Sequence, residues 1–204
     1  MRLKKSFIAG AVVILAGFLL PACVSQKMKY PQQAVIKTPS DIDHLNWQEQ
    51  GVFSYQDANH SFTASFNWHH ENNTSTLQLI GPLGAWRTII ILEPQHVTLI
   101  TAEGKKFTSP HLEDLMQNNV GWAVPLESIE DWLWGLPAPD CPIKKVVYQN
   151  AELVSFKQME WEIQYPENRK FFSAYYLPTK VFLSGHGKKI ILLIQKFQLQ
   201  PVSL

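Results

Sequence analysis

Residues 61–68 read Ser-Phe-Thr-Ala-Ser-Phe-Asn-Trp, with an apolar side chain at every second position. A β-strand turns successive side chains to opposite faces, so this stretch predicts a strand with one apolar and one polar face. Residues 159–165 repeat the pattern, with Met, Trp, Ile and Tyr separated by Glu, Glu and Gln. Half-buried strands of this kind are typical of antiparallel sheets that pack one face on a core.

Other alternating or apolar runs, bounded by turn residues, extend the pattern along most of the chain. The runs at 89–92 and 190–194 are apolar at consecutive positions, so we expect both of their faces to be covered. The further strands are expected near residues 51–57, 74–81, 86–92, 95–101, 144–149, 151–157, 177–183 and 189–199.

Two helices are expected between these groups of strands. Leu112, Leu115 and Met116 have helical spacing and are followed by a stop near Gly121. A proline favours the first turn of a helix and a glycine its carboxyl end, which predicts a second helix within residues 125–135.

A short helix is also expected ahead of the first strand. Ser40 and Asp43 have the spacing of a weak capping box, which predicts a helix running through Leu45 and Trp47.

The order of strands, then helices, then strands predicts a mainly β (α+β) fold. We expect an antiparallel sheet with its helices gathered on one side. A sheet of this many strands is expected to curl. A curled sheet under a helical cover would enclose an apolar space.

The amino-terminal residues 1–22 have the features of a signal peptide. Arg2, Lys4 and Lys5 precede an uncharged apolar run at 7–20, which is shorter than the roughly 20 residues a spanning helix needs. The run ends in Leu-Pro-Ala-Cys23, which resembles a bacterial lipobox. The resemblance implies S-diacylglycerol on Cys23, cleavage before it, and N-palmitoylation of the new amino terminus. An ordinary signal peptide and an uncleaved anchor are the alternatives.

Residues 23–38 are predicted to form a lipidated flexible tether, and residues 39–204 a single domain. Without residues 1–22, the chain has 15 basic and 17 acidic side chains, which argues against nucleic-acid binding. Cys141 is the other cysteine, so a disulfide framework is not expected, and the sequence has no metal-binding motif. The seven Trp, eleven Phe and six Tyr fit either a packed β core or an apolar cavity.

Several short motifs together span most of the chain after the signal peptide. They are, in order, Trp47-x-x-x-Gly51, Phe66-Asn67-Trp68, Leu79-x-Gly81-Pro82-Leu83-Gly84, Gly121-Trp122-x-Val124-Pro125-Leu126, Asp131-Trp132-Leu133-x-Gly135-Leu136-Pro137, Trp161-x-Ile163-x-Tyr165 and Leu177-Pro178, with the closing run 194–199. This ordered set resembles the LolB family of lipoprotein receptors.

The resemblance implies an incomplete antiparallel β-barrel covered by a few helices, with an apolar cavity. It implies an outer-membrane lipoprotein, lipid-anchored on the periplasmic face. Such a protein accepts the acyl chains of client lipoproteins from a periplasmic, LolA-like carrier and inserts the clients into the inner leaflet of the outer membrane. Phospholipid would be a further partner and the chain a monomer. No enzyme activity, cofactor or metal is implied.

The turn Pro82-Leu83-Gly84 lies between two predicted strands. Proline and glycine favour a turn, so Leu83 would sit at its apex. The leucine could fold back under its own loop. The resemblance instead implies a protruding loop that inserts into the membrane. Trp86, which follows closely, is either a second membrane-facing residue or a core residue of the next strand, and the core role is favoured.

The walls of an acyl-binding cavity are predicted among the large apolar residues of the motifs, although an ordinary core role is open for each. They are Phe66, Trp68, Trp122, Trp132, Leu133 and Trp161.

Two other classes of function compete with a lipoprotein receptor. An enzyme would draw on His69, His70 and His186, but adjacent strand residues face opposite sides, so locally bonded histidines are the simpler interpretation. A scaffolding lipoprotein of the outer membrane, without lipid transfer, is the remaining alternative.

Overall fold

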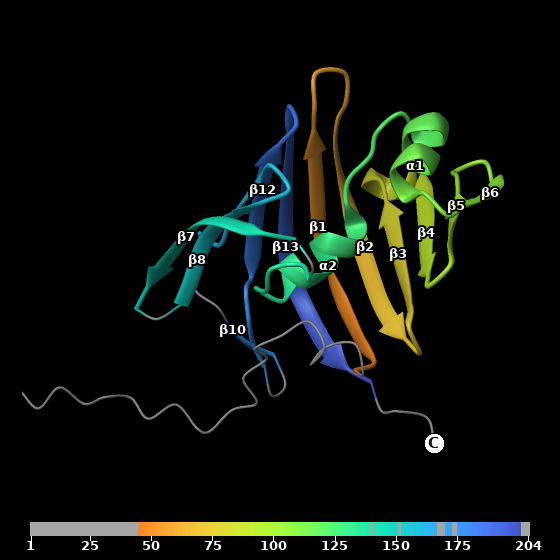
Figure 1. The fold of residues 1–204 in the computed structure, drawn as a ribbon. Coiled ribbons are helices and arrows are strands. Elements are labelled where there is room, and N and C mark those ends of the chain that lie inside the picture. The colour runs from red at the N-terminus through yellow and green to blue at the C-terminus, as the bar shows by residue number, and fades with distance from the viewer. Residues whose placement is uncertain (1–44, 140, 151, 167–169, 173–174, 201–204) are drawn as a thin grey trace, which may run out of the picture. The chain divides into compact units, whose positions relative to one another are not determined.

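The computed structural model describes residues 45–139, 141–150, 152–166, 170–172 and 175–200 (Figure 1). The predicted signal peptide, Cys23, the tether and the Ser40–Asp43 capping box lie outside the described residues.

Most of the described chain is β-strand. The strands before the helices are β1 Trp47–Gln56, β2 Ser61–Glu71, β3 Thr74–Ile80, β4 Arg87–Glu93, β5 His96–Ile100 and β6 Lys106–Ser109, with a short 3-10 turn η2 at Pro82–Gly84. The helices are α1 Leu112–Val120 and α2 Leu126–Leu133. The strands after them are β7 Ile143–Gln149, β8 Glu152–Gln158, β9 Trp161–Gln164, β10 Lys170–Phe172, β11 Tyr175–Leu177, β12 Lys180–Gly185 and β13 Lys188–Leu199.

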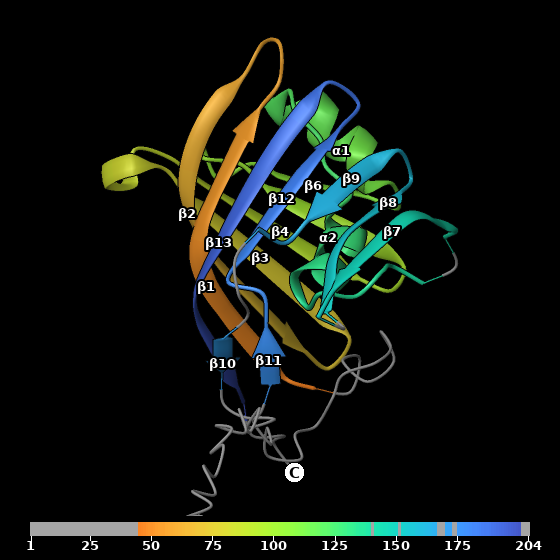
Figure 2. The same ribbon diagram turned by 90° about the vertical axis from the view of Figure 1, so that its left-hand side faces the viewer.

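Eleven strands form one open antiparallel sheet, in the order β6-β5-β4-β3-β2-β1-β13-β12-β9-β8-β7. The sheet has free edges at β6 and β7 and is not closed into a barrel, while β10 and β11 pair separately. Both helices lie against the same face of the sheet, as the two views show (Figures 1 and 2). The predicted incomplete barrel with a helical cover is confirmed.

The face of the sheet beneath the helices carries the core. In β2, Ala64, Phe66 and Trp68 are buried, as the alternation at 61–68 predicts. In the central strand β1, a side chain at Gly51 would place its Cβ 1.8 Å from the Leu193 carbonyl oxygen. The register between β1 and β13 shifts at this point, so glycine is required for the two strands to approach.

The two helices end where the sequence indicates. Gly121 follows α1 with φ +80°, and Gly135 lies two residues after α2 with φ +76°, the left-handed region that glycine enters without steric cost. Each helix buries one apolar side against the sheet. The buried residues are Leu112, Leu115 and Met116 of α1, and Leu126, Ile129, Trp132 and Leu133 of α2.

The carboxyl end of α2 is held on the sheet by Gln158, a buried residue of β8. Its carbonyl oxygen accepts hydrogen bonds from Trp132 Nε1 and Ala138 N, both at 2.9 Å. Its amide donates to the carbonyls of Ala138 at 2.9 Å and Cys141 at 2.8 Å. Tyr165 adds a hydrogen bond to the Trp132 carbonyl at 2.9 Å. Because Gln158 is fully paired, a polar side chain is tolerated within the core.

Two of the expectations about burial were wrong. In β4, Ile89 and Ile91 are only half-buried, and in β13 Ile191 is 38% exposed. Both helices cover the same face of the sheet, so side chains that point to the other face keep partial contact with solvent.

Some boundaries also differ from the expectations. Trp47 begins β1 rather than continuing a helix, because it pairs with His70 on one side and Leu199 on the other. Met159 lies in the turn between β8 and β9, with φ +50°, so the strand predicted at 159–165 begins at Trp161. The short strands β6, β10 and β11 were not predicted, since they are too brief to show a period.

We expect Gln158→Leu to lower the free energy of unfolding by about 3–5 kcal/mol, because four buried polar groups lose their partner. Chemical denaturation measures the change. Gln164→Leu, the same replacement at an exposed site on β9, should change it by less than about 0.5 kcal/mol. Equal effects of the two substitutions would contradict the role given to Gln158.

Candidate functional site

The loop between β3 and β4 presents Leu83 to solvent. Leu83 is fully exposed and has φ +53°, a left-handed conformation that is uncommon for leucine. Gly84 N donates to the Gly81 carbonyl at 3.0 Å and Ala85 N to the Pro82 carbonyl at 3.0 Å, which closes the turn beneath Leu83. The loop projects from the rest of the sheet at the left of Figure 2. The leucine is therefore not folded back under its own loop.

Trp86 anchors the base of this loop. Its indole meets the Phe62 ring edge-on at 5.5 Å, and the residue is half-buried against the core. A Cβ at Gly81 would lie 2.3 Å from Trp86 Nε1, so glycine leaves the space that the indole fills. The interpretation of Trp86 as a core residue agrees with this packing.

The six predicted cavity residues are all buried in one apolar cluster between the sheet and the helices. They are Phe66, Trp68, Trp122, Trp132, Leu133 and Trp161. Trp122 contacts Tyr55 at 5.3 Å and Phe62 at 5.1 Å between ring centroids. Trp132 lies 6.5 Å from Trp161, and Trp68 lies 6.4 Å from Trp47.

A concave site of about 360 Å³ opens beside α2, and none of those six residues lines it. Seven of its ten lining residues have polar or charged side chains; the ten are His70, Asn73, Ser75, Leu92, Glu93, Pro94, Glu127, Glu130, Asp131 and Pro139. Burial, followed by the nearby charges of Glu113 and Glu130, raises the pKa of Glu127. The predicted wall residues thus pack against each other and the cover instead of facing this opening.

The middle of α2 is held over the sheet by Glu130. His70 Nδ1 lies 2.9 Å from a Glu130 carboxylate oxygen, and Ser75 Oγ donates to the same carboxylate at 2.7 Å. The His70 ring also stacks on Trp47, with centroids 5.8 Å apart. These contacts give His70 a local structural role.

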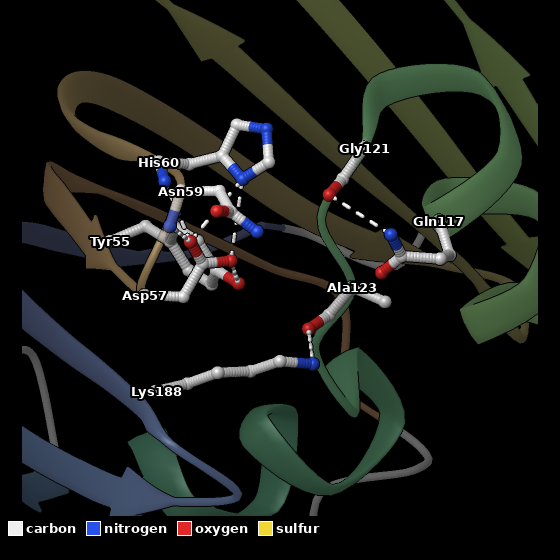
Figure 3. Close-up of polar contacts among 8 residues, drawn as sticks. All are labelled: Tyr55, Asp57, Asn59, His60, Gln117, Gly121, Ala123 and Lys188. Carbon is white, nitrogen blue, oxygen red and sulfur yellow. Dashed lines mark hydrogen bonds and ion pairs between the residues drawn. The ribbon is translucent and has the colours of Figure 1, made fainter.

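The segment between α1 and α2 is held at the opposite end of the sheet (Figure 3). Lys188 Nζ, from the first residue of β13, donates to the Ala123 carbonyl at 2.8 Å. Gln117 Nε2 donates to the Gly121 carbonyl at 3.1 Å. With Trp122 packed on Tyr55 and Phe62, this segment closes the cover over the β1–β2 end.

Asp57 shapes the β1–β2 turn beside that segment (Figure 3). Its carboxylate accepts from Tyr55 Oη at 2.7 Å and from the backbone N–H groups of Asn59 at 2.7 Å and His60 at 2.6 Å. The hydrogen bond from Tyr55 is the main reason that the pKa of Asp57 is low. Burial, with the same hydrogen bond and the Asp57 charge, raises the pKa of Tyr55.

Glu49 lies on the helix-covered face of the sheet and was not among the site residues predicted from the sequence. The residue is 1% exposed, and neither carboxyl oxygen has a hydrogen-bond partner among the described residues. Burial, and secondarily the charge of Glu130, raises its pKa to about 8. The signal was present: Glu49 occupies an inward position in the alternation of Trp47, Phe53 and Tyr55.

The remaining candidates show no joint site. His186 Nε2 lies 3.0 Å from the Met159 carbonyl, and Cys141 is a half-buried free thiol. Within the described part of the chain, no cluster of three metal-ligating side chains occurs. No helix in that part has the length and apolar content to cross a membrane.

The stability of the fold should depend on pH through Glu49. The unfolded carboxyl loses its proton near pH 4.5 and the folded one near pH 8, so rising pH across this window destabilises the fold. The slope is at most about 1.4 kcal/mol per pH unit. We expect Glu49→Gln to remove this loss of stability. The free energy of unfolding of the variant should therefore rise, relative to that of the natural chain, from pH 5 to pH 8.

Denaturation midpoints measured across that range test the expectation. Glu49→Leu also lacks the carboxyl and should show the same change in slope as Glu49→Gln. Parallel stability curves for all three proteins would show that Glu49 does not titrate in the folded state as described.

Comparison with known proteins identifies the family. The family model described as outer membrane lipoprotein LolB matches residues 45–197. The outer-membrane lipoprotein LolB of Cellvibrio japonicus (strain Ueda107) is 27% identical over 194 residues, covering 93% of this chain and 95% of the relative. That of Francisella tularensis subsp. tularensis (strain WY96-3418) is 24% identical over 200 residues, covering 96% and 95%.

Solved structures share the fold at low identity. A LolA superfamily protein from Nitrosomonas europaea aligns with a TM-score of 0.52 and 11% identity, covering 82% of this chain and 90% of that one. A DUF1329 family protein from Desulfovibrio piger aligns with a TM-score of 0.51 and 8% identity, covering 81% and 90%. The family match extends from the residues just before β1 almost to the end of β13, and the chain therefore belongs to the LolB family of outer-membrane lipoproteins, which act in lipoprotein localisation.

Proposed function

We propose that this chain accepts lipoproteins from a soluble periplasmic carrier of the LolA type and inserts them into the inner leaflet of the outer membrane. The LolB family consists of non-enzymatic lipoprotein receptors, and the fold is shared with a LolA superfamily protein. A receptor and a carrier with related folds could offer similar environments to the same acyl chains.

The exposed side chain of Leu83 is the observation that carries this proposal. An apolar side chain without protein contacts, at the tip of a closed turn, is suited to enter a lipid surface. Burial of one leucine contributes roughly 1.5–3 kcal/mol, enough to favour contact but not to anchor the domain. Pro82 and Gly84 set the turn that presents it. The loop acts at the delivery step, where the client leaves the receptor for the membrane.

The apolar cluster under α1 and α2 is the proposed binding region for acyl chains. Each buried CH₂ contributes about 0.8 kcal/mol, so acyl chains do not cross water without a protein cover. The six aromatic and aliphatic candidates pack together in this structure. Acyl chains would therefore enter by parting the helices from the sheet and replacing contacts among these side chains. Transfer without an energy source requires that this region bind acyl chains more tightly than the carrier does.

The lipid on Cys23 is proposed to locate the receptor. N-palmitoyl and S-diacylglycerol chains together give stable anchoring, whereas a single chain binds a membrane only marginally. The anchor would hold a monomeric domain at the periplasmic face of the outer membrane, near its phospholipid acceptor. The transfer itself is assigned to residues of the domain.

A scaffolding lipoprotein without lipid transfer is the second candidate. The close packing of the six predicted wall residues favours it, since a scaffold needs no space for a ligand. Leu83 distinguishes lipoprotein transfer from scaffolding, because a scaffold does not require an exposed leucine that contacts a membrane.

We expect Leu83→Glu in the full chain to slow delivery of client lipoproteins to the outer membrane by roughly tenfold or more, through loss of this apolar contact. Clients should still be accepted from the carrier, and so should accumulate bound to the variant. Cells in which the variant replaces the natural chain are fractionated, and the clients bound to it are quantified.

Ile143→Glu is the matched control. Ile143 is an exposed apolar residue on β7, an edge strand remote from the loop in the sheet order, and its replacement should leave delivery unchanged. Normal delivery by Leu83→Glu would refute the role of the loop. Loss of acceptance as well as delivery would place Leu83 at the carrier contact instead.

A further inference from the structure

A carboxyl group and an indole N–H lie side by side in the apolar cluster. Glu49 of β1 is directly opposite Trp68 of β2 in the antiparallel register. Both side chains point to the helix-covered face, where Glu49 is 1% and Trp68 0% exposed. Residues at such positions have Cβ atoms about 4.5–5.5 Å apart.

Neither of these polar groups has a hydrogen-bond partner within the part of the chain that the structure describes. Both carboxyl oxygens of Glu49 and Nε1 of Trp68 lack hydrogen bonds among the described residues. Buried polar groups are nearly always paired, and leaving them unpaired destabilises a fold. Gln158, on the same face, shows that this protein can pair a buried polar side chain completely. We therefore infer that a ligand supplies the hydrogen bonds that the Glu49 carboxyl and the Trp68 N–H lack.

The surroundings of the pair indicate an acyl ligand. Phe197 of β13 is the other neighbour of Glu49 in the register, and Trp47 is two residues away on the same face. Trp134, just after α2, packs edge-on against Phe197 at 5.0 Å and against Trp47 at 5.8 Å. The polar pair thus lies among aromatic rings that the end of the helical cover holds in place. When the cover parts from the sheet, an acyl chain that enters there brings its first polar group to Glu49 and Trp68.

The hydrogen-bonding groups of the pair select among acyl linkages. With its raised pKa, Glu49 carries a proton at neutral pH and so offers one O–H donor and one C=O acceptor. Trp68 offers an N–H donor. A secondary amide is complementary to this set, because its oxygen accepts from the donors and its N–H donates to the carboxyl oxygen. An ester supplies the oxygen but has no N–H.

We propose that Glu49 and Trp68 bind the amide of the N-acyl group of a client lipoprotein and so distinguish it from phospholipids, whose acyl linkages are esters. The inference rests on the proposed function and names the group that the acyl-binding region recognises.

Two synthetic ligands that differ by one atom test the proposal. One is N-palmitoyl-S-diacylglyceryl-cysteine methyl ester, and the other has an ester oxygen in place of the palmitoyl amide N–H. Each competes with a fluorescent fatty-acyl probe for the full chain in non-ionic detergent. We expect the natural chain to bind the amide about tenfold more tightly than its ester analogue, as one hydrogen bond at a buried site allows.

Variants separate the two residues. Glu49→Gln keeps an acceptor and a donor and should keep the preference for the amide. Glu49→Leu should bind both ligands equally. Trp68→Phe, which removes the N–H donor to the shared carbonyl oxygen together with part of the ring, should weaken both ligands alike and keep the preference. Thermal unfolding establishes that each variant is folded, and Glu49→Met replaces the leucine variant should that one fail to fold.

The outcomes distinguish this inference from the proposed function. Equal binding of the two ligands by the natural chain, or an unchanged preference in Glu49→Leu, would overturn the inference while leaving acyl binding intact. Failure of the natural chain to bind either ligand would overturn the proposed function, and the inference with it.

Discussion

Two short helices bury one face of an open sheet, and the other features of the structure follow from this packing. A sheet with free edges at β6 and β7 cannot bury that face by closing on itself. The helices complete the core, and polar contacts hold them at three places: Gln158 at the end of α2, Glu130 with His70 and Ser75 at its middle, and Lys188 with Ala123 ahead of it. Each of these contacts joins elements distant in sequence.

In this arrangement the apolar side chains form two groups that differ in their exposure to solvent. Those beneath the cover are shielded and packed, while Leu83 is fully exposed on a loop that leaves the sheet. We propose that the first group provides an environment for acyl chains and that the second provides contact with a membrane. The cover consists of helices and not of strands of the sheet, so the proposed parting of the cover would separate apolar and polar contacts but would unpair no strand.

Much of this fold was predictable from local pattern. The alternation at 61–68 fixed which face of β2 is buried, and Gly121 and Gly135 marked the helix ends because only glycine enters the left-handed region at low cost. The expectation that β4 and β13 are buried on both faces was wrong, because the composition of these strands does not reveal that both helices cover the same face of the sheet. The exposure of Leu83 was one of two outcomes that the turn residues allowed.

The candidate site was predictable only in part. The large apolar residues were correctly placed together, but the sequence does not show whether they line an open space or pack on one another. Glu49 was missed because a single acidic residue in a strand is usually read as solvent-facing. Its inward direction follows from the alternation within β1, but its position beside Trp68 and Phe197 depends on pairing with strands distant in sequence.

Delivery of other lipoproteins to the outer membrane is the proposed role of this chain. It is tested by depletion of the chain in its native cell, followed by separation of the inner and outer membranes. The account predicts that newly made lipoproteins will fail to reach the outer membrane and will accumulate before that step. Normal arrival of these lipoproteins in depleted cells would contradict it.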